Sequence, residues 1–116
     1  MRNKLTIVLI YIIFFFNFNL LSISKEHNKI LKVGLLAPLS GSHSELGNSL
    51  LYSLQLALEE INDQNVIIVP RDSGFNNKEK LNTAIQDIKS AGIKIVIGPV
   101  SHEEFQEAKK YNDLIF

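Results

Sequence analysis

Two hydrophobic periodicities alternate along this chain, one typical of buried strands and the other typical of amphipathic helices. Near-continuous apolar runs at 31–37, 66–69 and 93–97 predict strands that are covered on both faces. Between the first two runs the apolar spacing changes to that of a helix, which we expect over 47–62. Its apolar stripe consists of Leu46, Leu50, Leu54, Ala57 and Ile61.

The second half of the chain repeats this alternation. A helical stripe that includes Leu81 and Ile85 ends at Gly92, a residue type that commonly terminates helices. A short helix is expected over 101–110, and a further strand begins at 114–116. The predicted order is therefore β-α-β-α-β-α-β, which is an α/β fold.

Buried strands that are joined by helices of this length form parallel sheets with right-handed crossovers. We therefore expect a parallel sheet in which the 31–37 strand lies near the centre and is flanked by the 66–69 and 93–97 strands. The apolar character of all these runs requires cover on both faces of the sheet.

The first 24 residues have the parts of a secretory signal peptide. Arg2 and Lys4 are basic, an apolar run follows over 5–21, and Ser22 and Ser24 are small residues at alternate positions. The alternative is a retained membrane anchor, for which the run is short, because about 20 apolar residues are needed to span hydrocarbon. We expect cleavage after Ser24 and export to the periplasm.

After the signal, the chain divides into a linker over 25–30 and a domain over 31–116. Because the last predicted strand begins so near the end of the sequence, we expect this domain to be the amino-terminal part of a larger lobe. Arg2 and Lys4 lie in the signal, so ten of the twelve basic residues remain against twelve acidic ones. That balance predicts no attraction to nucleic acid, and contact with a membrane only through a partner.

Cysteine is absent from the sequence, which excludes disulfides, a thiolate nucleophile, cysteine-based zinc sites and a lipid-bearing cysteine. In a parallel sheet, ligands bind at the carboxyl ends of the strands, here the loops 38–46, 71–77 and 99–102. The first loop contains serine, histidine and glutamate, but a catalytic triad needs these residues to converge from separate elements. The histidines are scattered, and we expect no metal, no cofactor and no enzymatic activity.

Two positions in these loops allow both a structural and a binding role. The stretch 101–104 matches a capping box, in which Ser101 accepts from the N–H of Glu104 and Glu104 accepts from the N–H of Ser101. A serine at a helix start can also contact an anion, such as the carboxylate of an amino acid. Similarly, Asp72 either caps the turn before Gly74 or binds an ammonium group.

The segment KVGLLAPLSGSHSELG and its continuation resemble the opening of the type I periplasmic binding proteins of the leucine/isoleucine/valine-binding family. Those domains begin with a strand, a Pro-Leu-Ser-Gly loop, a glycine and a long helix with an acidic-Ile-Asn end. Here these features are 38–41, Gly47 and 60–62. Asp72 after the second strand and the stretch 97–101 after the third strand also match. The resemblance covers essentially all residues from Leu31 onward.

The resemblance implies an α/β lobe that, with a second lobe, closes on a small polar ligand such as an amino acid and delivers it to an ABC permease. The positions that it implies as ligand-binding are Ser40, Ser42, Leu46, Asp72, Ser101 and His102. The chain departs from the family at Leu46, where an aromatic residue is usual, and at His102 and Glu103, where small hydroxyl residues are usual. These departures bring it closer to the penicillin-binding-protein activators, which share the fold and contact peptidoglycan synthases.

We predict that export removes the residues up to Ser24, because the basic, apolar and small-residue segments follow one another in the required order. Amino-terminal sequencing of exported protein should then begin at Lys25. A protein that still begins at Met1 and sediments with membranes would show that the segment is an anchor.

Overall fold

The computed structural model describes residues 29–116, so the predicted signal peptide lies outside the described residues. In chain order the elements are β1 (Leu31–Ala37), η2 (Gly41–His43), α2 (Ser44–Ile61), β2 (Val66–Asp72), α3 (Lys78–Ser90), β3 (Ile95–Ile97) and α4 (His102–Ala108). Over residues 29–116, none of the helices is both long and apolar enough to cross a membrane.

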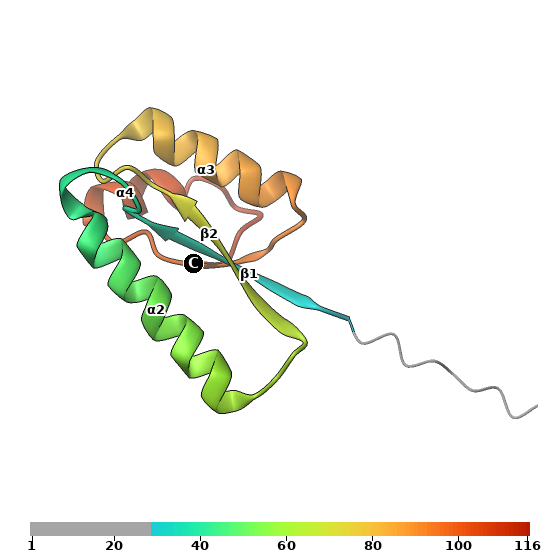
Figure 1. Cartoon of the computed structure of the whole chain (residues 1–116). Coiled ribbons are helices and arrows are strands. Elements are labelled where there is room, and N and C mark those ends of the chain that lie inside the picture. The colour runs from blue at the N-terminus through green and yellow to red at the C-terminus, as the bar shows by residue number, and fades with distance from the viewer. Residues whose placement is uncertain (1–28) are drawn as a thin grey trace, which may run out of the picture.

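The three strands form one parallel sheet in the order β2-β1-β3, and Figure 1 shows β1 beside β2. The register pairs Leu31 with Val66 on one side of β1, and Val33 with Ile95 on the other side. The α/β fold class, the parallel pairing and the central place of the 31–37 strand are therefore confirmed. The physical reason is burial of the central strand on both faces, since β1 is buried from Val33 to Ala37.

One face of the sheet packs against α3, and α4 packs against α3. Gly34 and Leu36 point to this face, because side chains alternate along a strand and a Cβ at Gly34 would lie 3.1 Å from Ile88 of α3. The resulting core cluster consists of Leu36, Leu81, Ala84, Ile85, Ile88, Ile93, Val96, Ala108 and Leu114. The amphipathic stripe predicted for the second helix thus contributes four of these nine residues, Leu81, Ala84, Ile85 and Ile88.

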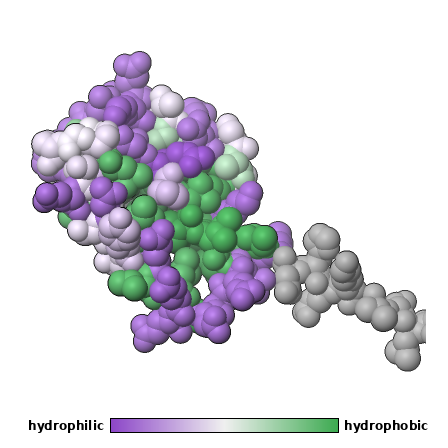
Figure 2. Space-filling view, viewed as in Figure 1, coloured by the Kyte–Doolittle hydropathy of each residue, from purple (hydrophilic) through white to green (hydrophobic). Residues whose placement is uncertain are grey.

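The opposite face is covered by α2, which packs on β1 and β2 (Figure 1). Within residues 29–116, α2 makes no contact with β3, so Ile95 and Ile97 are each 38% exposed. Figure 2 shows hydrophobic atoms gathered in the middle of the face seen in Figure 1, beside α2. The predicted cover is therefore partial on both faces, because α2 leaves β3 open and Ile67, which pairs with Lys32 on the α3 side, is 40% exposed. In the predicted stripe of α2, Leu46 and Ile61 are 44% and 67% exposed.

Several element boundaries differ from the predicted ones. β2 continues through Pro70 to Asp72, because it is the outer strand of the described sheet and the missing N–H of a proline is tolerated there. β3 begins at Ile95 and not at Ile93, although Ile93 is buried in the core. The predicted last strand is reduced to a parallel bridge between Ile115 and Ile95.

α2 meets the loop after β1 at Gly47, the only buried residue of this helix. A Cβ at Gly47 would overlap the carbonyl oxygen of Pro38, so the close approach of the two backbones requires glycine. The helix begins at Ser44, three residues before its predicted start, because the 3₁₀ turn η2 leads directly into it. Gly47 thus fixes how α2 lies against the carboxyl end of β1.

We predict that Gly47→Ala lowers the free energy of unfolding by about 1–3 kcal/mol, the usual cost of overpacking, since the new methyl group meets backbone that cannot move aside. In an exposed helix the same change would stabilise by about 1 kcal/mol. Urea unfolding measures the difference, with Asn48→Ala at the exposed neighbouring position as the control. A Gly47→Ala variant as stable as the wild type would show that the loop moves freely.

Candidate functional site

The loops that follow β1, β2 and β3 meet at the carboxyl edge of the sheet and are linked to one another by side chains. Between the first and second loops, Asp72 accepts a hydrogen bond from the N–H of Leu39 at 2.9 Å. The His43 ring also stacks on Phe75, with centroids 3.7 Å apart and planes 17° from parallel. Between the second and third loops, the Ser101 hydroxyl donates to Oδ1 of Asn76 at 2.7 Å.

Asp72, at the end of β2, is the centre of the first cluster. Its Oδ1 accepts from the N–H groups of Leu39 at 2.9 Å and Gly74 at 3.0 Å. Its Oδ2 accepts from the Ser40 hydroxyl and from Nζ of Lys80, the latter at 3.0 Å. Nζ of Lys80 also donates to the Ser40 hydroxyl oxygen at 2.8 Å. Asp72 therefore caps its turn, which is one of the two roles considered for it, and its other oxygen accepts from the ammonium group of Lys80. Binding of a ligand's ammonium group by Asp72 stays a prediction.

The pKa of Asp72 lies well below its ordinary value of 3.8. Partial burial raises this pKa, but hydrogen bonds from Ser40, Lys80, Gly74 and Leu39 together lower it by more. The carboxylate is therefore ionised at neutral pH, and it is matched by the positive charge of Lys80.

Lys80 was not among the residues predicted for the site. It lies in the first turn of α3, where a positive charge is unfavourable next to the positive end of the helix dipole. That misplaced charge is the signal that could have pointed to a nearby carboxylate. The Ser40–Lys80 pair is not arranged as a nucleophile and base, because Lys80 donates to Ser40 and so does not accept its proton.

A second cluster joins α4 to the loop before α3. Ser101 caps α4 as predicted, accepting from the N–H of Glu104 at 3.1 Å. The reciprocal half of the predicted capping box is wrong, because Oε1 of Glu104 accepts from the N–H of Asn76 at 3.1 Å. Glu104 is only 2% exposed, and the buried position lets it satisfy a backbone donor of another loop. The sequence pattern predicts only the capping role for Glu104.

The structure brings together Ser40 and Asp72, and it places Ser101 in the neighbouring cluster at the same edge. The other predicted residues lie apart from both clusters. The Ser42 hydroxyl lies 3.0 Å from Nδ1 of His43, Leu46 is 44% exposed on α2, and His102 lies 3.2 Å from the side-chain nitrogen of Gln106. Residues 29–116 contain no group of three side chains placed to hold a metal ion.

Neither a protein-family model nor a curated protein sequence matches the chain. Among solved structures, the chain is similar to the LpoA (YraM) C-domain from Haemophilus influenzae, a regulator of PBP1A, with 25% identity and a TM-score of 0.56. The match covers 70% of this chain and 24% of that chain, so the chain spans about a quarter of its length. The likeness supports the α/β fold, and membership of the leucine/isoleucine/valine-binding family stays a prediction.

We predict that Asp72→Asn makes the protein less stable at neutral pH and flattens the dependence of its stability on pH. Because the pKa is lowered on folding, ionised Asp72 stabilises the fold above pH 3.8, and this contribution is lost as the pH falls further. Chemical unfolding from pH 7 to pH 3 measures both effects, and loss of the charged acceptor should cost about 2 kcal/mol at pH 7.

The matched control is Thr83→Ala, an exposed polar residue that lines the same surface depression as Asp72. It should keep the pH dependence of the wild type. If Asp72→Asn instead kept the full acid-induced loss of stability, the other carboxylates would be responsible for it.

Proposed function

We propose that this chain is part of an extracytoplasmic α/β lobe that regulates a peptidoglycan synthase through protein contacts, without transport and without catalysis. The similarity to the LpoA C-domain, a regulator of PBP1A, supports this choice over a solute receptor. The signal-like sequence of residues 1–24 supports export to the periplasm, where such synthases act.

The observation that carries the proposal is the contact between Asp72 and the ammonium group of Lys80, a residue of the same chain. In a receptor for amino acids, an acidic side chain at this edge would be available to the ammonium group of the ligand. Here Lys80 already donates to both Asp72 and Ser40, at 3.0 and 2.8 Å. To bind Asp72, the ammonium group of a ligand would have to displace Lys80. Lys80 belongs to the same chain and loses no translational entropy when it contacts Asp72, whereas a free amino acid does. Lys80 is therefore the favoured partner.

The start of α4 is also poorly suited to the carboxylate of an amino acid. Glu103 and Glu104 occupy the first turn of this helix, and their negative charges oppose the attraction of the helix dipole for an anion. The Ser101 hydroxyl is engaged by the Glu104 N–H and by Asn76. Both of the groups that a free amino acid would need are thus satisfied within the chain.

Solute binding for an ABC permease is the second candidate function. It is favoured by the position of Ser40, Asp72 and Ser101 at the carboxyl edge of a parallel sheet, where α/β folds bind small ligands. In that function the ligand would come between this lobe and a second one. Leucine, isoleucine and valine are then the first ligands to test.

We predict that the full chain binds an immobilised PBP1A-type synthase in biolayer interferometry and gives no heat with any of the common amino acids in calorimetric titration. The regulator function requires the first result, and the closed Asp72 cluster predicts the second. An unrelated α/β protein of similar charge serves as the control for the synthase surface.

The opposite pattern would support the receptor function. In that case at least one amino acid would bind the wild type and the Thr83→Ala variant, but would fail to bind Asp72→Asn. The absence of synthase binding would by itself show that the regulator proposal is wrong.

A further inference from the structure

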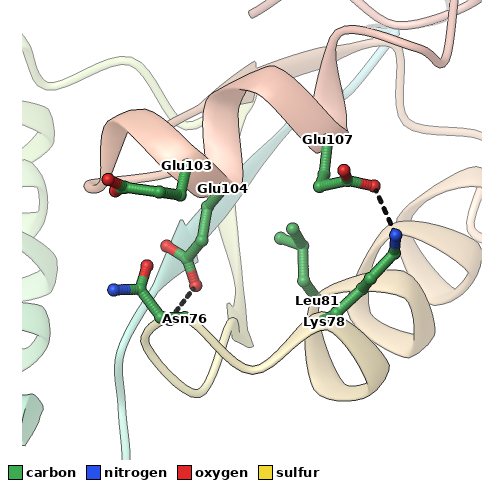
Figure 3. Close-up of a pocket in the computed structure, with 6 residues that line it drawn as sticks. All are labelled: Asn76, Lys78, Leu81, Glu103, Glu104 and Glu107. Carbon is green, nitrogen blue, oxygen red and sulfur yellow. Dashed lines mark hydrogen bonds and ion pairs between the residues drawn. The ribbon is translucent and has the colours of Figure 1, made fainter.

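A pocket of about 340 Å³ lies between α4 and the start of α3, apart from the Asp72 cluster (Figure 3). Its lining residues are Asn76, Lys78, Leu81, Glu103, Glu104 and Glu107. The volume is near the lower end of the range for ligand pockets, about 300–1,000 Å³, which suits a single side chain or a small molecule. Carboxylates from α4 form one wall, and α3 contributes an ammonium group and an apolar side chain.

Glu104 is the unusual residue of this pocket. Figure 3 shows its side chain projecting from α4 toward Asn76, whose N–H donates to Oε1 at 3.1 Å. The other oxygen, Oε2, is fully buried and has no hydrogen-bond partner among residues 29–116. A buried acceptor without a donor is costly, and the cost is larger for a carboxylate than for a neutral group. A ligand that brings an N–H donor to Oε2 would remove this cost.

The charges around Glu104 determine what kind of donor fits. Glu107 is already matched, since its carboxylate lies 3.1 Å from Nζ of Lys78 and 2.7 Å from Nζ of Lys110. The hydrogen bond from Lys110, followed by that from Lys78, lowers the pKa of Glu107. Glu103 is exposed and forms no ion pair with the described part of the chain. The pocket therefore keeps an excess of negative charge at Glu103 and Glu104.

We propose that this pocket binds an alkylammonium or guanidinium group, which donates to Oε2 of Glu104, is attracted by Glu103 and lays its apolar stem against Leu81. An organic cation fits better than a metal ion, because residues 29–116 provide no group of three metal-ligating side chains. Leu81 is an apolar residue in the lining of this pocket and would contact the stem. The proposal uses a different surface from the Asp72 cluster and does not depend on which partner the lobe has.

The test is a titration of the full, ¹⁵N-labelled chain, followed by amide chemical shifts. The small-molecule probes are agmatine and cadaverine, and pentanol is the uncharged control. A glycine-flanked arginine peptide with capped ends tests the same chemistry when a protein supplies it. The amide of Asn76 is the reporter, because it donates to Glu104.

We expect agmatine or the arginine peptide to shift the amides of Asn76, Lys78 and Glu104 at millimolar concentration, and pentanol to shift none of them. Binding of the peptide alone would assign the pocket to a partner's side chain, and binding of the free amines alone would assign it to a small molecule. No shift with any cationic probe would overturn the proposal. Shifts confined to other acidic surfaces, such as Glu59 and Glu60, would overturn it as well.

The decisive variant is Glu104→Gln, which keeps an oxygen for the Asn76 N–H and removes the charge. It should weaken binding of the cation by about tenfold or more, the loss typical of one hydrogen bond to a charged group. Glu107→Gln is the matched control on the same helix and should have a smaller effect, because Lys78 and Lys110 already neutralise that carboxylate.

Thermal melting confirms that each variant is folded before its affinity is compared. If Glu104→Gln does not fold, Glu103→Gln provides the comparison, because its exposed side chain can be changed without disturbing the core. Equal affinity in Glu103→Gln, Glu104→Gln and the wild type would overturn the proposal, whatever the shifts show.

Discussion

The carboxylate of Asp72 is the group on which the carboxyl edge of this sheet depends. The carboxyl ends of parallel strands leave loop N–H groups that no neighbouring strand can accept, and Asp72 accepts those of Leu39 and Gly74. It also accepts from Ser40 and from Lys80. One side chain therefore holds together the loop that leads into α2 and the turn that leads into α3, and its low pKa reflects the donors around it.

This arrangement changes what the resemblance to periplasmic binding proteins implies. An open edge with free hydroxyl and carboxylate groups would be ready for a small polar ligand, whereas this edge is closed by side chains of the chain itself. Lys80 donates to the carboxylate of Asp72, and the Ser101 hydroxyl donates to Asn76. Loops that are linked by their own side chains in this way favour the proposed contact with a protein over closure on a solute.

Two carboxylates at the same edge of the sheet differ in how deeply they are buried and in how many hydrogen-bond donors they have. Asp72 has donors for both oxygens and a matching charge. Glu104 is more deeply buried, and only one of its oxygens has a donor within the described chain. The first therefore serves the stability of the loops, and the second leaves an acceptor and a negative charge facing a pocket lined in part by apolar carbon.

The sequence by itself determined the order of the three strands and three α-helices, the parallel pairing and the central position of β1, because burial on both faces of a sheet requires continuous apolar runs. It also located the edge where the loops meet, and the cap at Ser101. It could not identify Lys80 as the partner of Ser40, forty residues away, nor Asn76 as the partner of Glu104. Those contacts join loops whose separation in space is set by the packing of α3 on the sheet and of α4 on α3. Local periodicity carries no information about that separation.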